Sequence, residues 1–436
     1  MNAPASPTSA APALSAASPS TYKWELLTLL WFAGFLNQGD RQIFNAILPR
    51  IRDSLGATDV QMGLVAALFT AFFGVLVPVA GWLGDRVSRK RLVCVSLLVF
   101  SAGTLLTGFS GGLISLIIFR SVATGAGESF FTPPALSLIG QHHTTTRSLA
   151  LSIYQTSQYV GVAVSSWVAA WLAERFGWRT AFYVFGGFGL VLMGVLMLRL
   201  KNDQPPVSAT STGTSASASA PHRPASGAFG ELLRIPSFLL LTAAFGCMVF
   251  TMTGFMTWMP TLLATKFQLS LSAAAFQAVF VHLLFAFVGV LLGGWWTDRR
   301  ARTRPITRFQ LGAVGLVFGA PFVVLLARAD TLPLVYVGLA GFGFFRGLYD
   351  ANIFAALYEV VAVHRRATAT GVMVCFAFVT GATAQLILGY LKQTMGLDRA
   401  LVWLAPSFFV GGLLIAFAAF RFFNRDREAA LALSPS

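Results

Sequence analysis

Apolar runs of similar length recur along the whole chain, separated by short polar stretches. A helix needs about 20 mostly apolar residues to cross the hydrocarbon core of a bilayer, and twelve runs reach that length. They fall at 24–49, 60–83, 92–112, 113–139, 147–173, 179–199, 237–264, 272–296, 308–327, 331–361, 367–391 and 400–423. The pattern predicts an all-α membrane protein with twelve transmembrane helices.

Polar stretches precede, separate and follow two groups of these runs. Residues 1–20 are rich in Ala, Pro, Ser and Thr and lack the charged start and apolar core of a signal peptide, so we expect a disordered tail. Residues 202–230 have a similar composition and are expected to form a flexible cytoplasmic linker. The linker separates a six-helix half at 21–201 from another at 231–423, and a cytoplasmic C-terminal tail follows at 424–436.

The two halves repeat a motif at the end of their second helix. The first copy is Gly81-Trp-Leu-Gly-Asp85-Arg86, and the second is Gly294-Trp-Trp-Thr-Asp298-Arg299. Two pseudo-symmetric halves of six helices are the plan of transporters whose site lies near the bilayer midplane, at the interface of the repeats.

Composition supports a membrane protein and excludes several other classes. Only 11% of the residues are charged and mean hydropathy is +0.71, whereas soluble proteins average about 25% charged residues. The net charge of +15 is spread between apolar segments rather than gathered in one patch, so nucleic acid is not an expected partner. The three cysteines stand inside apolar runs without metal-ligand spacing, and no catalytic motif stands in a suitable context. We expect no enzyme activity, metal or cofactor.

Basic residues also indicate orientation. The loops after even-numbered segments are rich in Arg and Lys, and the odd-numbered loops are poorer, with Arg50 and Arg52 the main exception. Because cytoplasmic loops carry this excess, both termini of this multi-pass protein are expected in the cytoplasm. The high content of Ala, Pro and Arg indicates a cell inner membrane.

The first segment carries an acid and an arginine at hydrocarbon depth. Such charges cost several kcal/mol unless they face a polar interior, a partner or water. On a helix, Asn37 and Arg41 share one stripe, with Gln38 beside Arg41 and Asp40 about 100° away. This polar face predicts a coupling or substrate site, and the alternative is an ion pair that only fixes packing.

Segment 4 carries a second charged pair. As an α-helix it places Arg120, Thr124, Glu128 and Phe131 on one face, with Arg120 and Glu128 about 12 Å apart. Near the middle of the membrane desolvation disfavours the carboxylate, so Glu128 is the first candidate to carry a proton. Asp40 ranks second, because the neighbouring arginine stabilises its charged form. The alternative for Glu128 is a permanent ion pair with Arg120 or Arg41.

Further polar residues stand in segments 5 and 10. Tyr154 and Gln158 share a stripe and are candidate hydrogen-bonding partners of substrate. Arg346 and Asp350 are one turn apart with Asn352 nearby, and such a pair is either structural or part of the site. As a second cation in the cavity, Arg346 would suit a dianionic substrate or an alternate pairing with Glu128. His282 is interpreted as a packed residue.

The motif Gly81-x-Leu-Gly-Asp85-Arg86-x-x-Arg89-Lys90 resembles the loop 2–3 signature of the major facilitator superfamily. The second copy of the motif, at Gly294 to Arg299, and the central linker agree with that resemblance. The resemblance implies a conformational latch formed by Gly81, Asp85, Arg86, Arg89, Asp298 and Arg299.

Within the superfamily, two motifs resemble both the anion:cation symporters of organic carboxylates and the Spinster-like transporters. They are Leu36-Asn-x-x-Asp40-Arg41 and Arg120-x(4)-Gly-x-Gly-Glu128. The resemblance implies that Arg41 holds the substrate anion and that Asp40 and Glu128 carry protons.

The expected function is proton-coupled symport of a small organic anion, a carboxylate or sugar acid, by alternating access in a monomer within the lipid bilayer. The proton gradient supplies the energy. The alternatives are a Spinster-like exporter of lysolipids or other amphiphiles, and a membrane sensor that binds without transport. The expected substrate-binding residues are Arg41, Asn37, Gln38, Arg120, Tyr154, Gln158, Arg346, Asp350 and Asn352.

Overall fold

The computed structural model describes residues 20–84, 87–143, 146–201, 231–301, 303–362 and 365–433 of the chain. The expected N-terminal tail lies outside the described residues, apart from Ser20 at the start of the first helix. The expected linker at 202–230 lies outside them entirely.

The described part of the N-terminal half is built of long helices, and its fourth membrane segment is divided into four pieces. The elements are α1 (Ser20–Leu55), α2 (Asp59–Gly84), α3 (Arg89–Thr107), α4 (Leu113–Leu116), the π-helix η1 (Ile117–Thr124), α5 (Gly125–Ser129), α6 (Thr132–His142), α7 (Arg147–Phe176) and α8 (Trp178–Arg199).

The C-terminal half repeats this plan, and here the tenth and twelfth segments are each divided in two. The elements are α10 (Pro236–Lys266), α11 (Leu271–Ala301), α12 (Thr307–Arg328), α13 (Leu332–Asp350), α14 (Ile353–Val360), α15 (Arg366–Met395), α16 (Leu397–Val402), α17 (Leu404–Arg421) and α18 (Phe423–Ala432). Most of the expected C-terminal tail is therefore helical, as α18.

Ten membrane segments of the described chain are long and apolar enough to cross a bilayer. Helices α1 and α7 are long as well, but polar residues such as Asp40 and Gln158 dilute their apolar character. Glycines with positive φ end α1 at Gly56, separate α7 from α8 at Gly177 and separate α15 from α16 at Gly396. Gly177 and Gly396 occupy equivalent places in the two halves.

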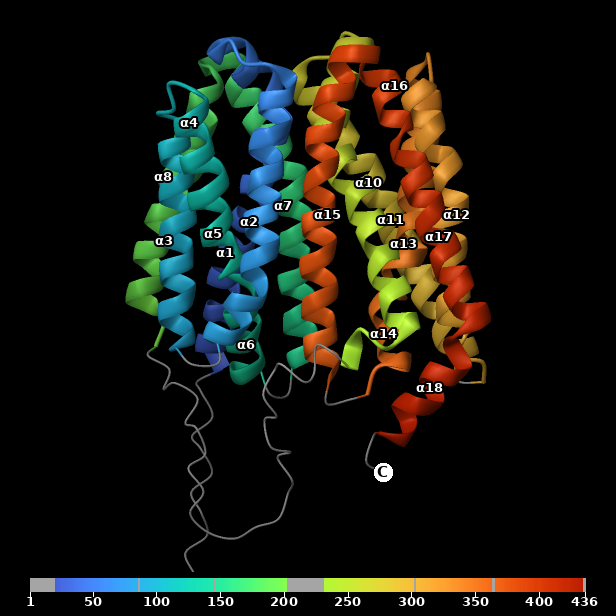
Figure 1. Ribbon diagram of the computed structural model, residues 1–436. Coiled ribbons are helices and arrows are strands. Elements are labelled where there is room, and N and C mark those ends of the chain that lie inside the picture. The colour runs from blue at the N-terminus through green and yellow to red at the C-terminus, as the bar shows by residue number, and fades with distance from the viewer. Residues whose placement is uncertain are drawn as a thin grey trace, which may run out of the picture.

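The two halves stand side by side as separate bundles (Figure 1). Helix α2 packs against α15, and α7 packs against α11, so that each half contributes two helices to the main interface. Helices α6, α14 and α18 lie at one end of the molecule, and α4 and α16 lie at the other (Figure 1). The interface between the bundles therefore runs along the direction in which the helices cross the membrane.

Small residues let helices of each bundle approach closely, as is usual between membrane helices. A Cβ atom added at Gly161 of α7 would lie 2.7 Å from the carbonyl oxygen of Phe35 in α1. In the second half, a Cβ at Gly347 of α13 would lie 2.2 Å from the carbonyl oxygen of Ala286 in α11. These contacts fix how the polar faces of α1 and α13 are presented to the interface.

Polar contacts join the halves at the end where α2 begins and α15 ends. Asp59 Oδ1 accepts from Lys392 Nζ at 2.6 Å and from Arg52 Nη1 at 2.9 Å. The carboxylate of Glu174 accepts from the backbone N–H of Ser272 at 3.1 Å and from its hydroxyl at 2.8 Å, at the start of α11. This end of the molecule is closed by bonds between the two halves.

Candidate functional site

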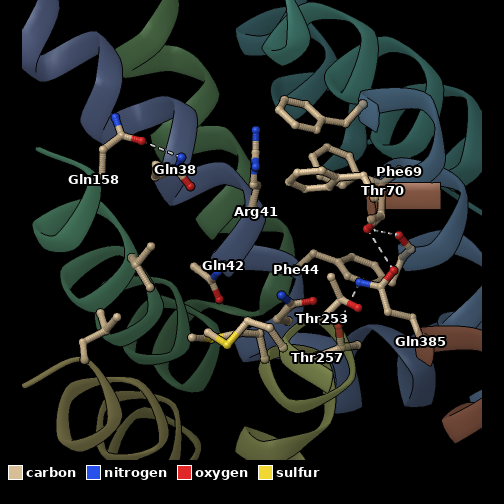
Figure 2. A pocket seen from close by; sticks show the side chains of 18 of the residues that line it. Gln38, Arg41, Gln42, Phe44, Phe69, Thr70, Gln158, Thr253, Thr257 and Gln385 are labelled. Carbon is tan, nitrogen blue, oxygen red and sulfur yellow. Dashed lines mark hydrogen bonds between the residues drawn. The ribbon is translucent and has the colours of Figure 1, made fainter. Parts of the chain in front are cut away.

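A cavity of about 360 Å³ lies between the halves (Figure 2). Helices α1, α2, η1 and α7 line it from the N-terminal half, and α10, α11, α13 and α15 line it from the C-terminal half. The charged side chains among its described lining residues are Arg41, Arg120 and Arg346. The site therefore presents positive charge from both halves.

Arg41 forms a buried ion pair with Glu128 at the wall of this cavity. Arg41 Nε donates to Glu128 Oε2 at 2.6 Å, and the Glu128 side chain is fully buried. The guanidinium carbon of Arg41 lies 3.9 Å from the centre of the Phe73 ring. Figure 2 shows Arg41 between Gln38 on one side and Phe69 on the other. Glu128 is thus paired with Arg41, one of the two partners that the sequence left open.

The position of Glu128 depends on a widened helix. Residues of segment 4 around Arg120 form the π-helix η1, in which the Thr124 hydroxyl donates to the Phe119 carbonyl at 2.9 Å. Gly127 then packs so closely on α3 that a Cβ there would lie 2.5 Å from the nitrogen of Phe100. The prediction of one continuous α-helix is therefore wrong, and the spacing of 1.5 Å per residue does not apply here. Arg120, Thr124, Glu128 and Phe131 are nevertheless all buried.

Asn37 and Asp40 lie behind the cavity wall. Asn37 donates to the backbone carbonyl of Glu128 at 3.3 Å, and the Thr104 hydroxyl donates to Asp40 Oδ2 at 2.6 Å. Among the described residues Asp40 forms no ion pair, because its side chain is directed toward α3 while that of Arg41 reaches the cavity. Asp40 and Arg41 are therefore not directly bonded, and the expected stabilisation of the charged form of Asp40 by its neighbour in sequence stays a prediction. Asn37 positions Glu128 and does not line the cavity.

Arg120 has a different environment. Its side chain is 3% exposed, and its guanidinium carbon lies 4.2 Å from the centre of the Phe69 ring. Within the described part of the chain Arg120 forms no ion pair, and its Nε has no hydrogen-bond partner. It is a desolvated cation whose charge is open to an anion in the cavity.

The polar stripe of α7 reaches the cavity only in part. Gln38 Nε2 donates to Gln158 Oε1 at 2.5 Å, and both residues line the cavity. Tyr154 is instead buried against α1, where its ring would lie 3.0 Å from a Cβ added at Gly34. The expectation that Tyr154 contacts substrate is therefore not met in this conformation.

Arg346, on α13, is the third arginine of the cavity. Its Nη2 lies 2.9 Å from Asp350 Oδ2, and its Nη1 lies 2.8 Å from Nε2 of His282 on α11. Asp350 supports Arg346 and is not itself among the lining residues. Asn352 is also away from the cavity, because it sits at the break between α13 and α14 and donates back to the Leu348 carbonyl at 2.9 Å.

Neutral residues that the sequence did not single out complete the site. The Thr70 hydroxyl donates to Gln385 Oε1 at 2.9 Å, and Gln385 Nε2 donates to the Thr257 hydroxyl at 3.0 Å (Figure 2). These bonds connect α2 of one half to α15 and α10 of the other. The only signal in the sequence is an uncharged polar residue inside an apolar run, and such residues are common in membrane helices.

The predicted latch is only partly within the described residues. Asp85 and Arg86 lie outside them. Gly81 is in the last turn of α2, Arg89 begins α3, and Asp298 is in the last turn of α11, followed by Arg299, whose guanidinium carbon lies 4.2 Å from the Trp295 ring centre. The latch remains a prediction from the motif.

Two repeated bundles of membrane-crossing helices, with a charged cavity between them, define a polytopic membrane transporter. The chain matches the model of the Major Facilitator Superfamily over residues 30–382 and belongs to that superfamily, whose members are transporters rather than enzymes. Among the described residues no group of three His, Cys, Asp or Glu side chains is placed to hold a metal ion.

Known proteins from two branches are similar to almost the whole chain. The D-galactonate transporter of Escherichia coli O6:H1 is 27% identical over 92% of this chain and 96% of its own length. Protein spinster homolog 1 of Xenopus laevis is 28% identical over 93% of this chain and 82% of its own length. The solved structure of a bacterial homologue of Spinster, inward-facing and unoccupied, superposes with a TM-score of 0.77 at 20% identity, covering 96% of this chain and all of that one.

Proposed function

We propose that this transporter carries a small organic anion, a carboxylate or sugar acid, together with a proton by alternating access. The observation that carries the proposal is the ion pair between Arg41, which lines the cavity, and Glu128, which is fully buried behind it. The two groups that a symporter must couple, an anion-binding cation and a proton-binding acid, are here directly bonded to one another.

The coupling is electrostatic. Leaving one partner of a buried ion pair uncompensated costs about 3–5 kcal/mol, so Arg41 needs a negative charge from Glu128 or from the cargo. Glu128 Oε1 has no hydrogen-bond partner in the described part of the chain and is free to take a proton. When it does, Arg41 is released to the carboxylate of the cargo. Proton and anion then enter the occluded state together.

The rest of the cavity supports a hydroxylated acid as cargo. Arg120 offers a second cationic donor, and Gln38 and Gln158 offer neutral donors and acceptors. The similar D-galactonate transporter carries, by its name, a sugar acid. Asp40 is the second candidate for a proton, because it is buried with only the Thr104 hydroxyl bonded to it among the described residues.

The arginine-rich loops support an orientation with both termini in the cytoplasm, and we infer a location in a cell inner membrane. In that orientation the end joined by Asp59 and Lys392 faces the outside, and the structure corresponds to a state closed to that side. The proposed transporter works as a monomer, without a cofactor, and draws its energy from the proton gradient.

Uptake into proteoliposomes tests the proposal. We expect an inward proton gradient to drive uptake of one member of a panel of sugar acids and small carboxylates by the wild-type protein. In Glu128→Gln the amide still accepts from Arg41 but cannot exchange a proton, so gradient-driven uptake is expected to be lost while counterflow exchange of the anion survives.

Glu25→Gln is the matched control, because Glu25 pairs with Arg199 on an exposed part of α1. It should behave as wild type in both assays. Gradient-driven uptake that persists in Glu128→Gln would exclude Glu128 as the coupling acid.

A second candidate function is export of amphiphiles. The cavity is lined by Phe44, Phe69, Phe73 and Phe378 as well as by arginines, and the chain is similar to Spinster homologues. If a well-folded wild-type preparation moves no carboxylate, labelled lysolipid is the next substrate to test, and its movement would favour this candidate.

A further inference from the structure

The guanidinium group of Arg346 is held from two sides. Nη2 is paired with Asp350 at 2.9 Å, and Nη1 lies 2.8 Å from Nε2 of His282. An arginine has five N–H donors, so three remain for other partners. One of these, on Nε, is buried without a partner among the described residues. Because Arg346 lines the cavity, the other two are available to a molecule bound there.

His282 acts as the acceptor in this cluster. A guanidinium group has donors only, so the His282 ring accepts at Nε2 and is a neutral imidazole with its proton on Nδ1. The ring is fully buried between Phe255 and Phe342, whose centres lie 5.0 and 4.8 Å away. An imidazolium could not accept this bond, so the contact with Arg346 depends on the neutral ring.

Close packing of two helices fixes the cluster. A Cβ at Gly343 would lie 2.3 Å from the backbone oxygen of His282, and one at Gly347 would lie 2.2 Å from that of Ala286. Helix α13 therefore rests directly on α11 on both sides of Arg346. The arginine is presented to the cavity by a rigid pair of helices from the C-terminal half.

Asp350 decides what kind of group Arg346 can bind. Its negative charge already neutralises Arg346, and a second carboxylate at this end of the cavity would meet Asp350 as a like charge. A hydroxyl group meets no such repulsion and can accept from the remaining N–H donors. In the N-terminal half, by contrast, Arg120 has no ion pair among the described residues.

We propose that His282, Arg346 and Asp350 form a specificity site that binds the uncharged, hydroxylated end of a monoanionic cargo and discriminates against a second carboxylate. Asp350 sets this selection, and His282 is a positioning residue for Arg346. This inference rests on the proposed function, in which the N-terminal arginines hold the carboxylate. It replaces the expectation that Arg346 suits a dianion.

Two probes that differ at one end only test the selection. D-Galactonate ends in a CH₂OH group, and galactarate carries a carboxylate in its place. We expect galactarate to compete with labelled D-galactonate at least about ten-fold less well than unlabelled D-galactonate in the wild-type protein. In Asp350→Asn the like charge is gone and Arg346 is an unneutralised cation, so the preference should move toward galactarate by about ten-fold.

Asp330→Asn makes the same chemical change on a residue that is 92% exposed, and it should leave the preference unchanged. For the positioning role, His282→Gln supplies an acceptor oxygen, whereas His282→Phe fills the aromatic site without one. We expect His282→Gln to keep the KM for D-galactonate within about three-fold of wild type, and His282→Phe to raise it about ten-fold with little change in kcat. A role in packing alone would not separate these two variants in that way.

Several outcomes would overturn the inference. Equal competition by the two sugar acids in the wild-type protein would do so without any variant. An unchanged ratio in a folded Asp350→Asn protein that still takes up D-galactonate would overturn the inference and leave the proposed function standing. If the wild-type protein takes up another carboxylate of the panel but neither binds nor transports these two sugar acids, this inference fails and the proposed function stands. If the protein moves no carboxylate at all, both fail.

Discussion

Three arginines line one cavity, and they differ in whether a carboxylate neutralises their charge. Arg41 is paired with Glu128 and Arg346 with Asp350, whereas Arg120 has no ion pair among the described residues. The centre of the Phe69 ring lies 4.2 Å from the Arg120 guanidinium carbon. A cation–π contact of a desolvated cation contributes about 2 kcal/mol, but it supplies no negative charge. Arg120 is therefore the cavity arginine with most to gain from an anionic cargo.

Replacement of Arg120 tests this assignment. We expect Arg120→Gln to raise the KM for the anion at least about ten-fold, because a hydrogen bond to a charged group is worth about 1.5–3 kcal/mol. Proton coupling should survive, since Glu128 and Arg41 are unchanged, so uptake should still respond to the gradient. Uptake against concentration, with and without a gradient, measures both quantities.

Arg328→Gln is the control, because Arg328 is exposed at the end of α12. An unchanged KM in Arg120→Gln would remove Arg120 from the substrate site.

The sequence predicted which charges matter but not how they pair. Arg41, Arg120, Glu128 and Arg346 could all be singled out, since charges inside apolar runs are costly unless they have a partner or a role. Their pairing depends on how segments far apart in sequence are packed. Asp40 illustrates this, because it is next to Arg41 in sequence and yet its hydrogen bond is to Thr104 on α3.

At the scale of elements, membrane-spanning segments could be predicted well and their interruptions could not. A run of about 20 apolar residues signals a membrane helix by itself. The π-helix η1 instead depends on the Thr124 hydroxyl and on Gly127 packed against α3. The first is a local bond between a side chain and the backbone, and the second is a tertiary contact. Neither appears in the spacing of apolar residues, so a periodicity argument could not predict the division of segment 4.

The contact between α11 and α13 makes a prediction about stability. In Gly347→Ala the new Cβ would lie 2.2 Å from the Ala286 oxygen and 2.8 Å from the Val290 nitrogen, so one helix must shift. Overpacking of this kind costs about 1–3 kcal/mol. We expect a melting temperature several degrees lower in detergent, measured by thermal unfolding, together with weaker binding at the Arg346 cluster.

Gly294→Ala on α11 is the matched control, because a Cβ there would meet no atom within 4 Å. It should be neutral or slightly stabilising, since Ala favours a helix over Gly by about 1 kcal/mol. Equal melting temperatures for the two variants would contradict the close contact.

At the scale of the whole molecule, the repeat predicted two six-helix halves with a site between them. It could not predict which end of the molecule is closed, because the states of an alternating-access cycle share one sequence and differ in population. The bonds of Asp59 with Lys392 and of Glu174 with Ser272 identify the closed end.

Loss of the Asp59 contact should open that end. Asp59→Asn removes the charge that Lys392 and Arg52 share, and a partly exposed pair of this kind contributes up to about 1 kcal/mol. We therefore expect the population open at this end to rise up to about five-fold. Spin labels at Phe176→Cys and Gln393→Cys, which are exposed on opposite halves, would report it as a larger fraction of long distances.

The distances require a background from which the three native cysteines have been removed. Asp59→Glu keeps the charge, so its distance distribution should stay close to that of the spin-labelled protein that retains Asp59. Identical distributions for Asp59→Asn and Asp59→Glu would show that this ion pair does not hold the halves together.

All the charged side chains among the described residues that line the cavity are arginines. A guanidinium group keeps its proton at every pH at which a protein stays folded. The positive charge offered to cargo is therefore constant, and any titration of binding must arise from the groups behind it, which are the carboxyl groups and His282. Over the pH range in which His282 is neutral and the cargo is fully ionised, affinity should then fall in one step as the pH rises. A lysine in the cavity would add a second step to this pH profile.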